Sequence, residues 1–182
     1  MACVPQLGDI GIVTIHGAGG WLIGLGERLA GGGRNATWRH AFVVTAVGAT
    51  PELTRIAEAE PGGAREASLA QYADGPVLWL RCPDDCRERV AAAATAMLHT
   101  KYSWLDYLAV ALHHWGINAG WLERYIAADG HEMCSAYADE AARRGGWHLF
   151  GPMASPPSAE VWEGDVMPAD LAQLAEKLGA SA

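Results

Sequence analysis

The sequence has few basic residues, no long apolar run and few cysteines, and each shortage excludes a class of protein. Lysine and arginine total 13 of 182 residues against 21 acidic residues, so the formal net charge is −8. Proteins that bind nucleic acids or anionic membrane surfaces usually carry an excess of basic residues. No apolar run reaches the length of about 18 residues that a membrane-spanning helix needs. We therefore expect no nucleic-acid partner and no membrane span.

The four cysteines are too few for a disulfide framework in a chain of 182 residues. Two of them, Cys82 and Cys86, are four residues apart. No second Cys or His pair at ligand spacing accompanies them, so we expect packing residues and no metal ion. The N-terminus lacks the basic segment of a signal peptide, and Asp9 interrupts its short apolar stretch. We expect synthesis in the cytoplasm without a signal peptide, and we expect no cofactor.

Apolar residues make up 51% of the sequence and charged residues 19%, which is the composition of a globular protein. A chain of this length is most simply one domain that buries about 70% of the surface of its unfolded chain. We expect a single domain over residues 1–182, with residues 151–182 as a C-terminal extension packed on it. Pro168 is expected near the first position of a last helix over residues 171–178.

Short runs of β-branched and apolar residues predict strands at 10–15, 38–47, 53–59 and 77–81. The short connections favour a meander for the first three strands. A short helical turn is expected at 68–72. Helical periodicity predicts a long helix to about residue 100, capped by Asp84 or Asp85, and further helices at 21–29, 102–114 and 121–128.

Residues 132–146 predict one further helix, and it carries Cys134 in its first turn. Apolar residues recur at helical spacing, and the pair Gly145–Gly146 supplies a C-cap. The positive end of the helix dipole favours a thiolate over a thiol. Such a position suits a nucleophile, but inert buried cysteines also occupy it.

Five short motifs, taken in order, resemble the circularly permuted branch of the NlpC-type cysteine peptidases. They are Gly-Asp-Ile-Gly at 8–11, Trp-Arg-His-Ala at 38–41, Glu-Ala-Glu-Pro-Gly-Gly at 58–63, Tyr-Ser-Trp at 102–104 and Met-Cys-Ser-Ala-Tyr at 133–137. The order His, acid, Cys implies the permutation, because the usual branch has Cys before His. The branch includes bacterial YiiX-like proteins, with lecithin:retinol acyltransferase as a distant relative. The sequence departs from it at Ala136, where members often carry Asp or Glu.

The resemblance covers residues 8–146 and implies an α+β, papain-like fold. In that fold an antiparallel sheet of about four to six strands packs against helices in the permuted topology. We predict that Trp38 and Tyr102, which belong to the matching motifs, contribute to substrate binding. The apolar, tryptophan-rich stretch 102–121 would suit an acyl chain, although aromatic residues at helical spacing are more often core.

The same resemblance, together with the residue types, implies a catalytic set. Cys134 is the expected nucleophile, His40 the base that takes its proton, and Glu58 the group that orients the imidazole. Glu60 remains an alternative to Glu58, since alternation places both on the same face of a strand. Glu58 is preferred because it matches the motif and lies farther from the Pro-Gly turn. The backbone N–H of Cys134 is one candidate oxyanion donor, and the second donor is left open.

These residues predict a thiol hydrolase, either an amidase or an endopeptidase, that acts through an acyl-enzyme on peptidoglycan stem peptides. One alternative keeps the site but acts on a lipid or another acyl ester, as a hydrolase or acyltransferase. Another alternative is a structural papain-like component of a phage tail or virion, assembled into a larger particle. Because we expect no signal peptide and find no wall-binding module, a wall hydrolase would need delivery by lysis, by a secretion system or in a phage particle.

Overall fold

The computed structural model describes residues 4–14, 37–60, 63–99, 134–150, 166 and 168–180. Within these residues the chain forms five strands, one short 3-10 helix and three α-helices. In chain order these are β1 Ile10–Val13, β2 His40–Ala46, β3 Arg55–Glu60, β4 Gly63–Ser68, η2 Leu69–Tyr72, β5 Val77–Leu80, α2 Arg87–Ala96, α5 Cys134–Arg144 and α6 Pro168–Lys177. The predicted α+β class is confirmed.

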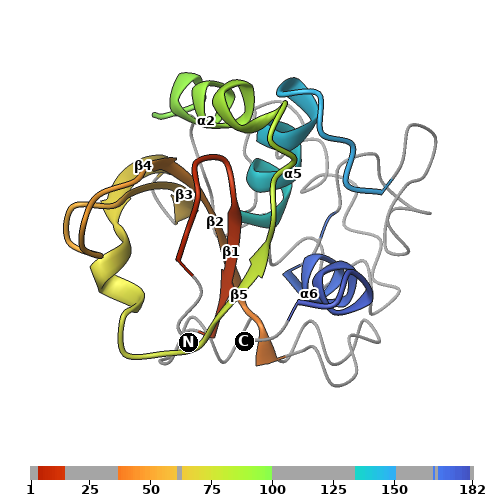
Figure 1. Ribbon diagram of the computed structural model, residues 1–182, viewed down its shortest axis with the longest axis horizontal. Coiled ribbons are helices and arrows are strands. Elements are labelled where there is room, and N and C mark those ends of the chain that lie inside the picture. Colours follow the sequence, from red (N-terminus) through yellow and green to blue (C-terminus); the bar gives the residue numbers. More distant parts are fainter. Residues whose placement is uncertain are drawn as a thin grey trace, which may run out of the picture.

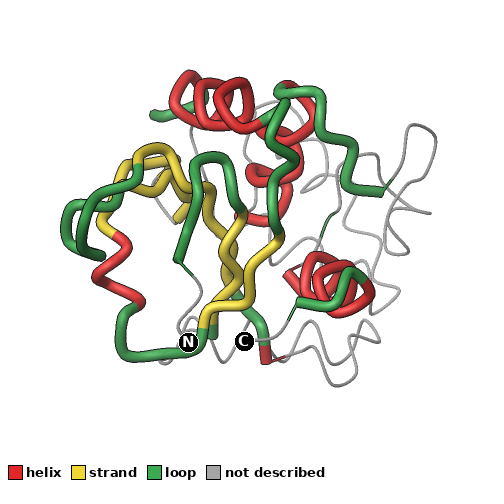
Figure 2. The backbone as a smooth tube through the Cα atoms, viewed as in Figure 1, coloured by secondary structure: helices red, strands yellow, loops and turns green. Residues whose placement is uncertain are grey.

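The five strands form one sheet in the order β4-β3-β2-β1-β5, and every neighbouring pair is antiparallel. The first three strands form the predicted meander. The chain then turns through β4 and η2 and returns to the free side of β1 as β5, as Figures 1 and 2 show. The strand number lies within the predicted range of four to six.

Strand β4 was not predicted from the sequence. Its residues, Gly-Ala-Arg-Glu-Ala-Ser, include no β-branched or aromatic side chain, so local propensity gives no strand signal. The strand forms because it pairs with β3 over its whole length, from Arg55 opposite Ser68 to Glu60 opposite Gly63. The η2 helix that follows matches the predicted helical turn, and the Ser68 hydroxyl caps it by accepting from the backbone N–H of Ala70.

The two faces of the sheet pack into separate apolar clusters. The helix-side cluster combines buried residues of α2, α5 and α6 with strand residues that include Ile10, Ile12, Ala41, Val43, Ala57 and Leu80. The second cluster contains Val13, Phe42, Val44, Ile56, Leu69 and Trp79. The three helices therefore cover the same face, and Figure 1 shows them gathered above and to the right of the strands.

Asp9, directly before β1, is a buried carboxylate that joins three segments. Its Oδ1 accepts from the backbone N–H of Cys82 at 3.0 Å and from Arg87 Nη1 at 2.9 Å. Its Oδ2 accepts from the backbone N–H of Gln6 at 3.0 Å and from Arg81 Nη1. A buried carboxylate is tolerated only when such donors satisfy it. Asp9 therefore fixes β1 to the segment that joins β5 to α2.

Helix α2 is shorter than predicted, and its predicted N-cap is wrong. The cap position is Cys86, which makes no capping hydrogen bond through its side chain. Asp84 lies too early to cap the helix, and its carboxylate instead accepts from Arg87 Nε at 2.8 Å. Helix α6 begins at Pro168, as expected.

Other sequence predictions lie outside the described residues. These are the helices at 21–29, 102–114 and 121–128. None of the helices formed by the described residues is long and apolar enough to cross a membrane.

Helix α5 begins at Cys134 and ends in the predicted glycine cap. Gly146 has a φ of 85°, its N–H donates to the Arg143 carbonyl at 3.0 Å, and the Trp147 N–H donates to the Ala142 carbonyl at 2.8 Å. This pair of bonds is the Schellman motif. Beside it, Gly145 lies so close to α2 that an added Cβ would stand 2.7 Å from the backbone N and Cα of Val90.

We expect Gly145→Ala to destabilise the protein by about 1–3 kcal/mol, because the new methyl group can be accommodated only if α2 and α5 move apart. Urea denaturation measures the effect. Gly75→Ala is the matched control, since its Cβ would meet no atom within 4 Å. Equal stabilities for the two variants would show that the contact between α2 and α5 tolerates the added volume.

Candidate active site

Two residues at the ends of their elements meet in the structure. Cys134 is the first residue of α5, and His40 is the first residue of β2. The Cys134 thiol is a hydrogen-bond partner of His40, although 94 residues separate the two in sequence. Both side chains are buried, with Cys134 0% exposed and His40 5% exposed. The structure thus brings together the expected nucleophile and the expected base.

The second nitrogen of His40 contacts the expected third residue. His40 Nε2 lies 3.0 Å from Glu58 Oε2. The sheet register explains the contact: Glu58 on β3 stands opposite Phe42 on β2, so His40 is its diagonal neighbour on the same face. An ionised carboxylate can only accept, so Nε2 is the donor and Nδ1 is the ring nitrogen left for the thiol.

Glu58 is completely buried, and four side chains satisfy its carboxylate. Tyr72 Oη donates to Oε2 at 2.7 Å, beside His40. On Oε1, Gln71 Nε2 donates at 2.7 Å, and Arg65 donates from Nη2 at 2.8 Å and from Nε at 3.1 Å. Because donors saturate both oxygens, the carboxylate can be buried and charged at once.

The electrostatics of this group favour charged forms. Burial acts to lower the pKa of His40, but the charge and hydrogen bond of Cys134 and the contact with Glu58 outweigh it and raise that pKa to about 10. Burial acts to raise the pKa of Glu58, but His40, Tyr72 and Gln71 outweigh it and lower that pKa to about 2. At neutral pH the geometry therefore favours an imidazolium at His40 beside an ionised Glu58 carboxylate.

The alternative third residue, Glu60, lies nearby but has a different partner. Its Oε2 pairs with Arg65 Nη2 at 2.9 Å, while the same Nη2 pairs with Glu58. Donor atoms of His40, Glu58 and Glu60 lie within 4.8 Å of one another, which is close enough to consider a metal ion. However, the Arg65 guanidinium already contacts both carboxylates, so a cation occupies this position and we assign no metal ion to it.

Three of the residues around Glu58 were not assigned a role from the sequence. Arg65 lies on β4, the strand that local propensity does not predict, and Gln71 and Tyr72 lie on η2. Their position near Glu58 can be inferred from the sequence only indirectly. A short turn that follows a hairpin brings the chain back across the face of β3. That inference requires β4 to be recognised first.

The two residues predicted to bind substrate have different outcomes. Trp38 is partly buried and packs against the helix-side cluster, two residues before His40. Tyr102 lies outside the described residues. The role of both in substrate binding stays a prediction.

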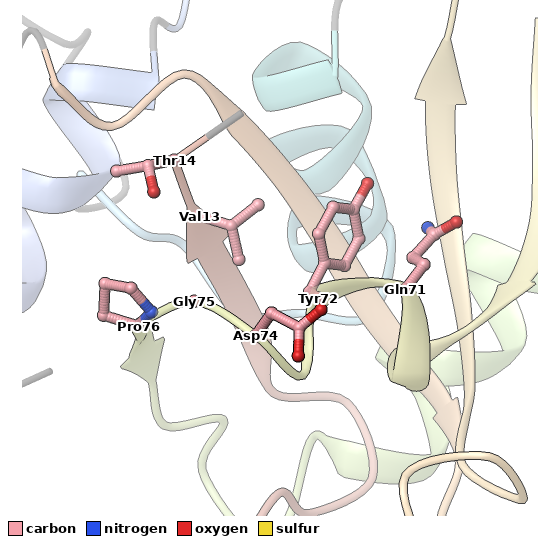
Figure 3. A pocket seen from close by; sticks show the side chains of 7 residues that line it. All are labelled: Val13, Thr14, Gln71, Tyr72, Asp74, Gly75 and Pro76. Atoms are coloured by element: carbon pink, nitrogen blue, oxygen red, sulfur yellow. The ribbon is translucent and has the colours of Figure 1, made fainter. Parts of the chain in front are cut away.

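A cavity of about 400 Å³ opens beside the residues that hold Glu58. It is lined by residues from the end of β1, from η2 and from the loop that leads to β5, namely Val13, Thr14, Gln71, Tyr72, Asp74, Gly75 and Pro76 (Figure 3). Tyr72 and Gln71 therefore contact both the cavity and Glu58. The Tyr72 ring also stacks on Phe42, with centroids 5.2 Å apart, and lies 5.8 Å from the ring of His40.

We expect Glu58→Gln to reduce the loss of stability in acid. The pKa of Glu58 is lower in the folded protein than its usual 4.5, so Glu58 stabilises the fold above pH 4.5 and loses that contribution as the pH falls toward 2. Urea denaturation at several pH values measures the slope of the unfolding free energy across this window. The exposed Glu66→Gln is the control and should keep the parent slope. If the unfolding free energy of Glu58→Gln had the same pH slope as that of the parent protein, the result would contradict an ionised Glu58.

Comparison with known proteins does not identify the family of this chain. No protein-family model matches the sequence, and no curated protein matches it as a relative. The resemblance to the permuted NlpC-type peptidases therefore depends on the short motifs, and the papain-like topology stays a prediction. The contacts among Cys134, His40 and Glu58 are independent of that resemblance.

Proposed function

We propose that this protein is a thiol hydrolase that acts through an acyl-enzyme. The proposal is based on the arrangement of three side chains. The Cys134 thiol is hydrogen-bonded to His40, and His40 Nε2 lies 3.0 Å from the buried Glu58. A thiol needs a base or a favourable field to become a nucleophile, and a third group must fix the imidazole. Each of these roles has a residue in contact with the next.

In the proposed reaction the Cys134 thiolate attacks the carbonyl carbon of the substrate. The backbone N–H of Cys134, at the start of α5, is a candidate donor to the oxygen that becomes negative. The His40 imidazolium then gives its proton to the leaving amine or alcohol as the carbon–heteroatom bond breaks, which leaves a thioester. His40 next takes a proton from water, and the resulting hydroxide-like oxygen displaces the sulfur and releases the acid.

The electrostatics favour this role over a purely structural one. A purely structural protein gains little from a buried imidazolium. Burying a charge costs free energy unless enough partners, in good geometry, replace the lost water. Here Glu58 accepts from four side chains, and its charge in turn favours the protonated form of His40. A structural component of a phage tail or virion would not require this arrangement.

The substrate class in this proposal is an amide of a peptidoglycan stem peptide. It is supported by the sequence resemblance, while the geometry supports acyl transfer from either an amide or an ester. A lipid or acyl ester is the alternative substrate, and the same assay distinguishes the two.

We expect iodoacetamide to label Cys134 about tenfold or more faster than Cys82 at neutral pH. Both thiols are buried, at 0% and 1% exposure, so access does not favour Cys134. Burial, and then the neighbouring Cys86, raise the pKa of Cys82 to about 12, whereas Cys134 pairs with His40. Peptide mass spectrometry after timed labelling measures both rates.

His40→Ala should remove the advantage of Cys134, and His148→Ala, at an exposed position after α5, should preserve it. Equal labelling of Cys134 and Cys82 in the parent protein would contradict an activated thiol.

We expect turnover to depend on all three residues of the set. Cys134→Ser should abolish it at a stability cost of about 1 kcal/mol, because a hydroxyl is a much weaker nucleophile of similar volume. His40→Ala should lower kcat/KM by about 10²- to 10⁴-fold, and the double variant should be no worse than the more damaging single change. Glu58→Gln should retain part of the activity, since it orients the imidazole without reacting.

The assay uses purified cell wall and a panel of acyl esters, with mass spectrometry to detect products and any covalent adduct on Cys134. Release of stem-peptide fragments that requires Cys134 supports the proposed amidase, and turnover of esters alone supports the alternative substrate. If neither substrate gives turnover or an adduct that depends on Cys134, the enzyme proposal fails.

A further inference from the structure

We propose that Tyr72, Gln71 and Arg65 are positioning residues, which together keep Glu58 ionised and hold its Oε2 against His40 Nε2. This inference rests on the proposed function only in treating His40 and Cys134 as a working pair. It assigns a role to three residues outside the expected catalytic set.

The number of hydrogen bonds that Glu58 accepts is the first reason to assign this role. A carboxylate has about four lone-pair sites for hydrogen bonds. Oε1 accepts from Gln71 and twice from Arg65, at 2.7, 2.8 and 3.1 Å. Oε2 accepts from Tyr72 at 2.7 Å and from His40 at 3.0 Å. Because both oxygens are saturated, rotating the carboxylate away from His40 would break several bonds at once.

The position of Tyr72 carries the second step. Its ring lies parallel to the ring of Phe42, with an interplanar angle of 3°. The position of the hydroxyl is therefore fixed both by this packing and by the hydrogen bond to Glu58. Burial and the charge of Glu58 raise the pKa of Tyr72, so its hydroxyl stays protonated, and a donor, at neutral pH. Tyr72 and His40 thus share one oxygen, and Tyr72 sets where that oxygen lies.

The charges around Glu58 carry the third step. The titratable groups that face it are His40 from β2, Arg65 from β4, Tyr72 from η2 and, through His40, Cys134 from α5. Glu60 on its own strand adds a second negative charge, and Arg65 contacts both carboxylates at 2.8 and 2.9 Å. Arg65 therefore offsets the repulsion between the two glutamates, which would otherwise favour protonation of Glu58.

A functional consequence follows for acidic conditions. A protonated Glu58 no longer favours the imidazolium form of His40, which weakens the interaction of His40 with the Cys134 sulfur and should make that sulfur less reactive. In the parent protein Glu58 stays ionised to a low pH. Each lost donor should raise the pH at which Glu58 is protonated, and the reactivity of Cys134 should then fall at a higher pH.

The experiment compares Tyr72→Phe, Gln71→Leu and Arg65→Gln with the parent protein. The rate of Cys134 alkylation by iodoacetamide is measured from pH 2 to 8, and the Glu58 carboxyl is titrated by ¹³C NMR over the same range. In each variant we expect the Glu58 titration to move upward by about one pH unit, since each lost hydrogen bond had favoured the charged form. We expect the acid side of the alkylation profile to move in the same direction, and the Tyr72→Phe/Arg65→Gln double variant to move further.

Two control variants remove comparable groups elsewhere. Tyr137→Phe deletes a buried hydroxyl that donates to the Ala94 carbonyl at 2.5 Å. Arg55→Gln deletes a guanidinium on the same β3–β4 hairpin, where it pairs with Glu66 at 3.9 Å. Both controls can lower the melting temperature, but neither should move the Glu58 titration.

An unchanged Glu58 titration in the three test variants, or an equal shift in the controls, would overturn the positioning role. The NMR titration does not depend on turnover or on the thiol. It therefore tests the positioning role even if the parent protein shows no preferential labelling of Cys134, a result that would overturn the proposed function instead.

Discussion

The buried charge of Glu58 is the constraint on which the arrangement of the site depends. A carboxylate with no exposed surface is unstable in a protein unless donors replace the water it has lost. Those donors come from three different elements, β2, β4 and η2, so the hairpin and the turn after it must both form before the charge can be buried. One buried side chain therefore links β2, the β3–β4 hairpin and η2.

The chain buries a second carboxylate, Asp9. Comparing Asp9 with Glu58 distinguishes a purely structural carboxylate from one that can take part in catalysis. Asp9 accepts from two backbone N–H groups and from two arginines, all of which keep the same protonation state across the physiological pH range. Glu58 instead shares one oxygen with His40, which is also the partner of the Cys134 thiol and can exchange a proton with it. Asp9 can therefore only hold segments together, whereas Glu58 can also influence where a proton resides.

The sequence predicts the parts of the fold whose signal is local. β1, β2, β3, β5 and the α5 helix follow from apolar periodicity and from glycine caps. β4 could not be found in this way, because Gly-Ala-Arg-Glu-Ala-Ser has no strand propensity and is held by pairing alone. The same limit applies to the site: Cys134, His40 and Glu58 belong to motifs, but Arg65, Gln71 and Tyr72 come together only once the hairpin exists.

The cap at the end of α5 has a consequence for the spacing of the sequence. Cys134 and Gly145 are 11 residues apart, which is close to three helical turns at 3.6 residues per turn, so both lie on the same side of the helix. Gly145 is the residue that lets α2 approach, and it lies about 16 Å along the axis from the thiol. Adding or removing one residue between them would turn the sulfur by about 100° relative to the helix packing. The spacing between the thiol and the contact with α2 is therefore set by the helix, and a one-residue insertion that a surface loop would tolerate would separate the two here.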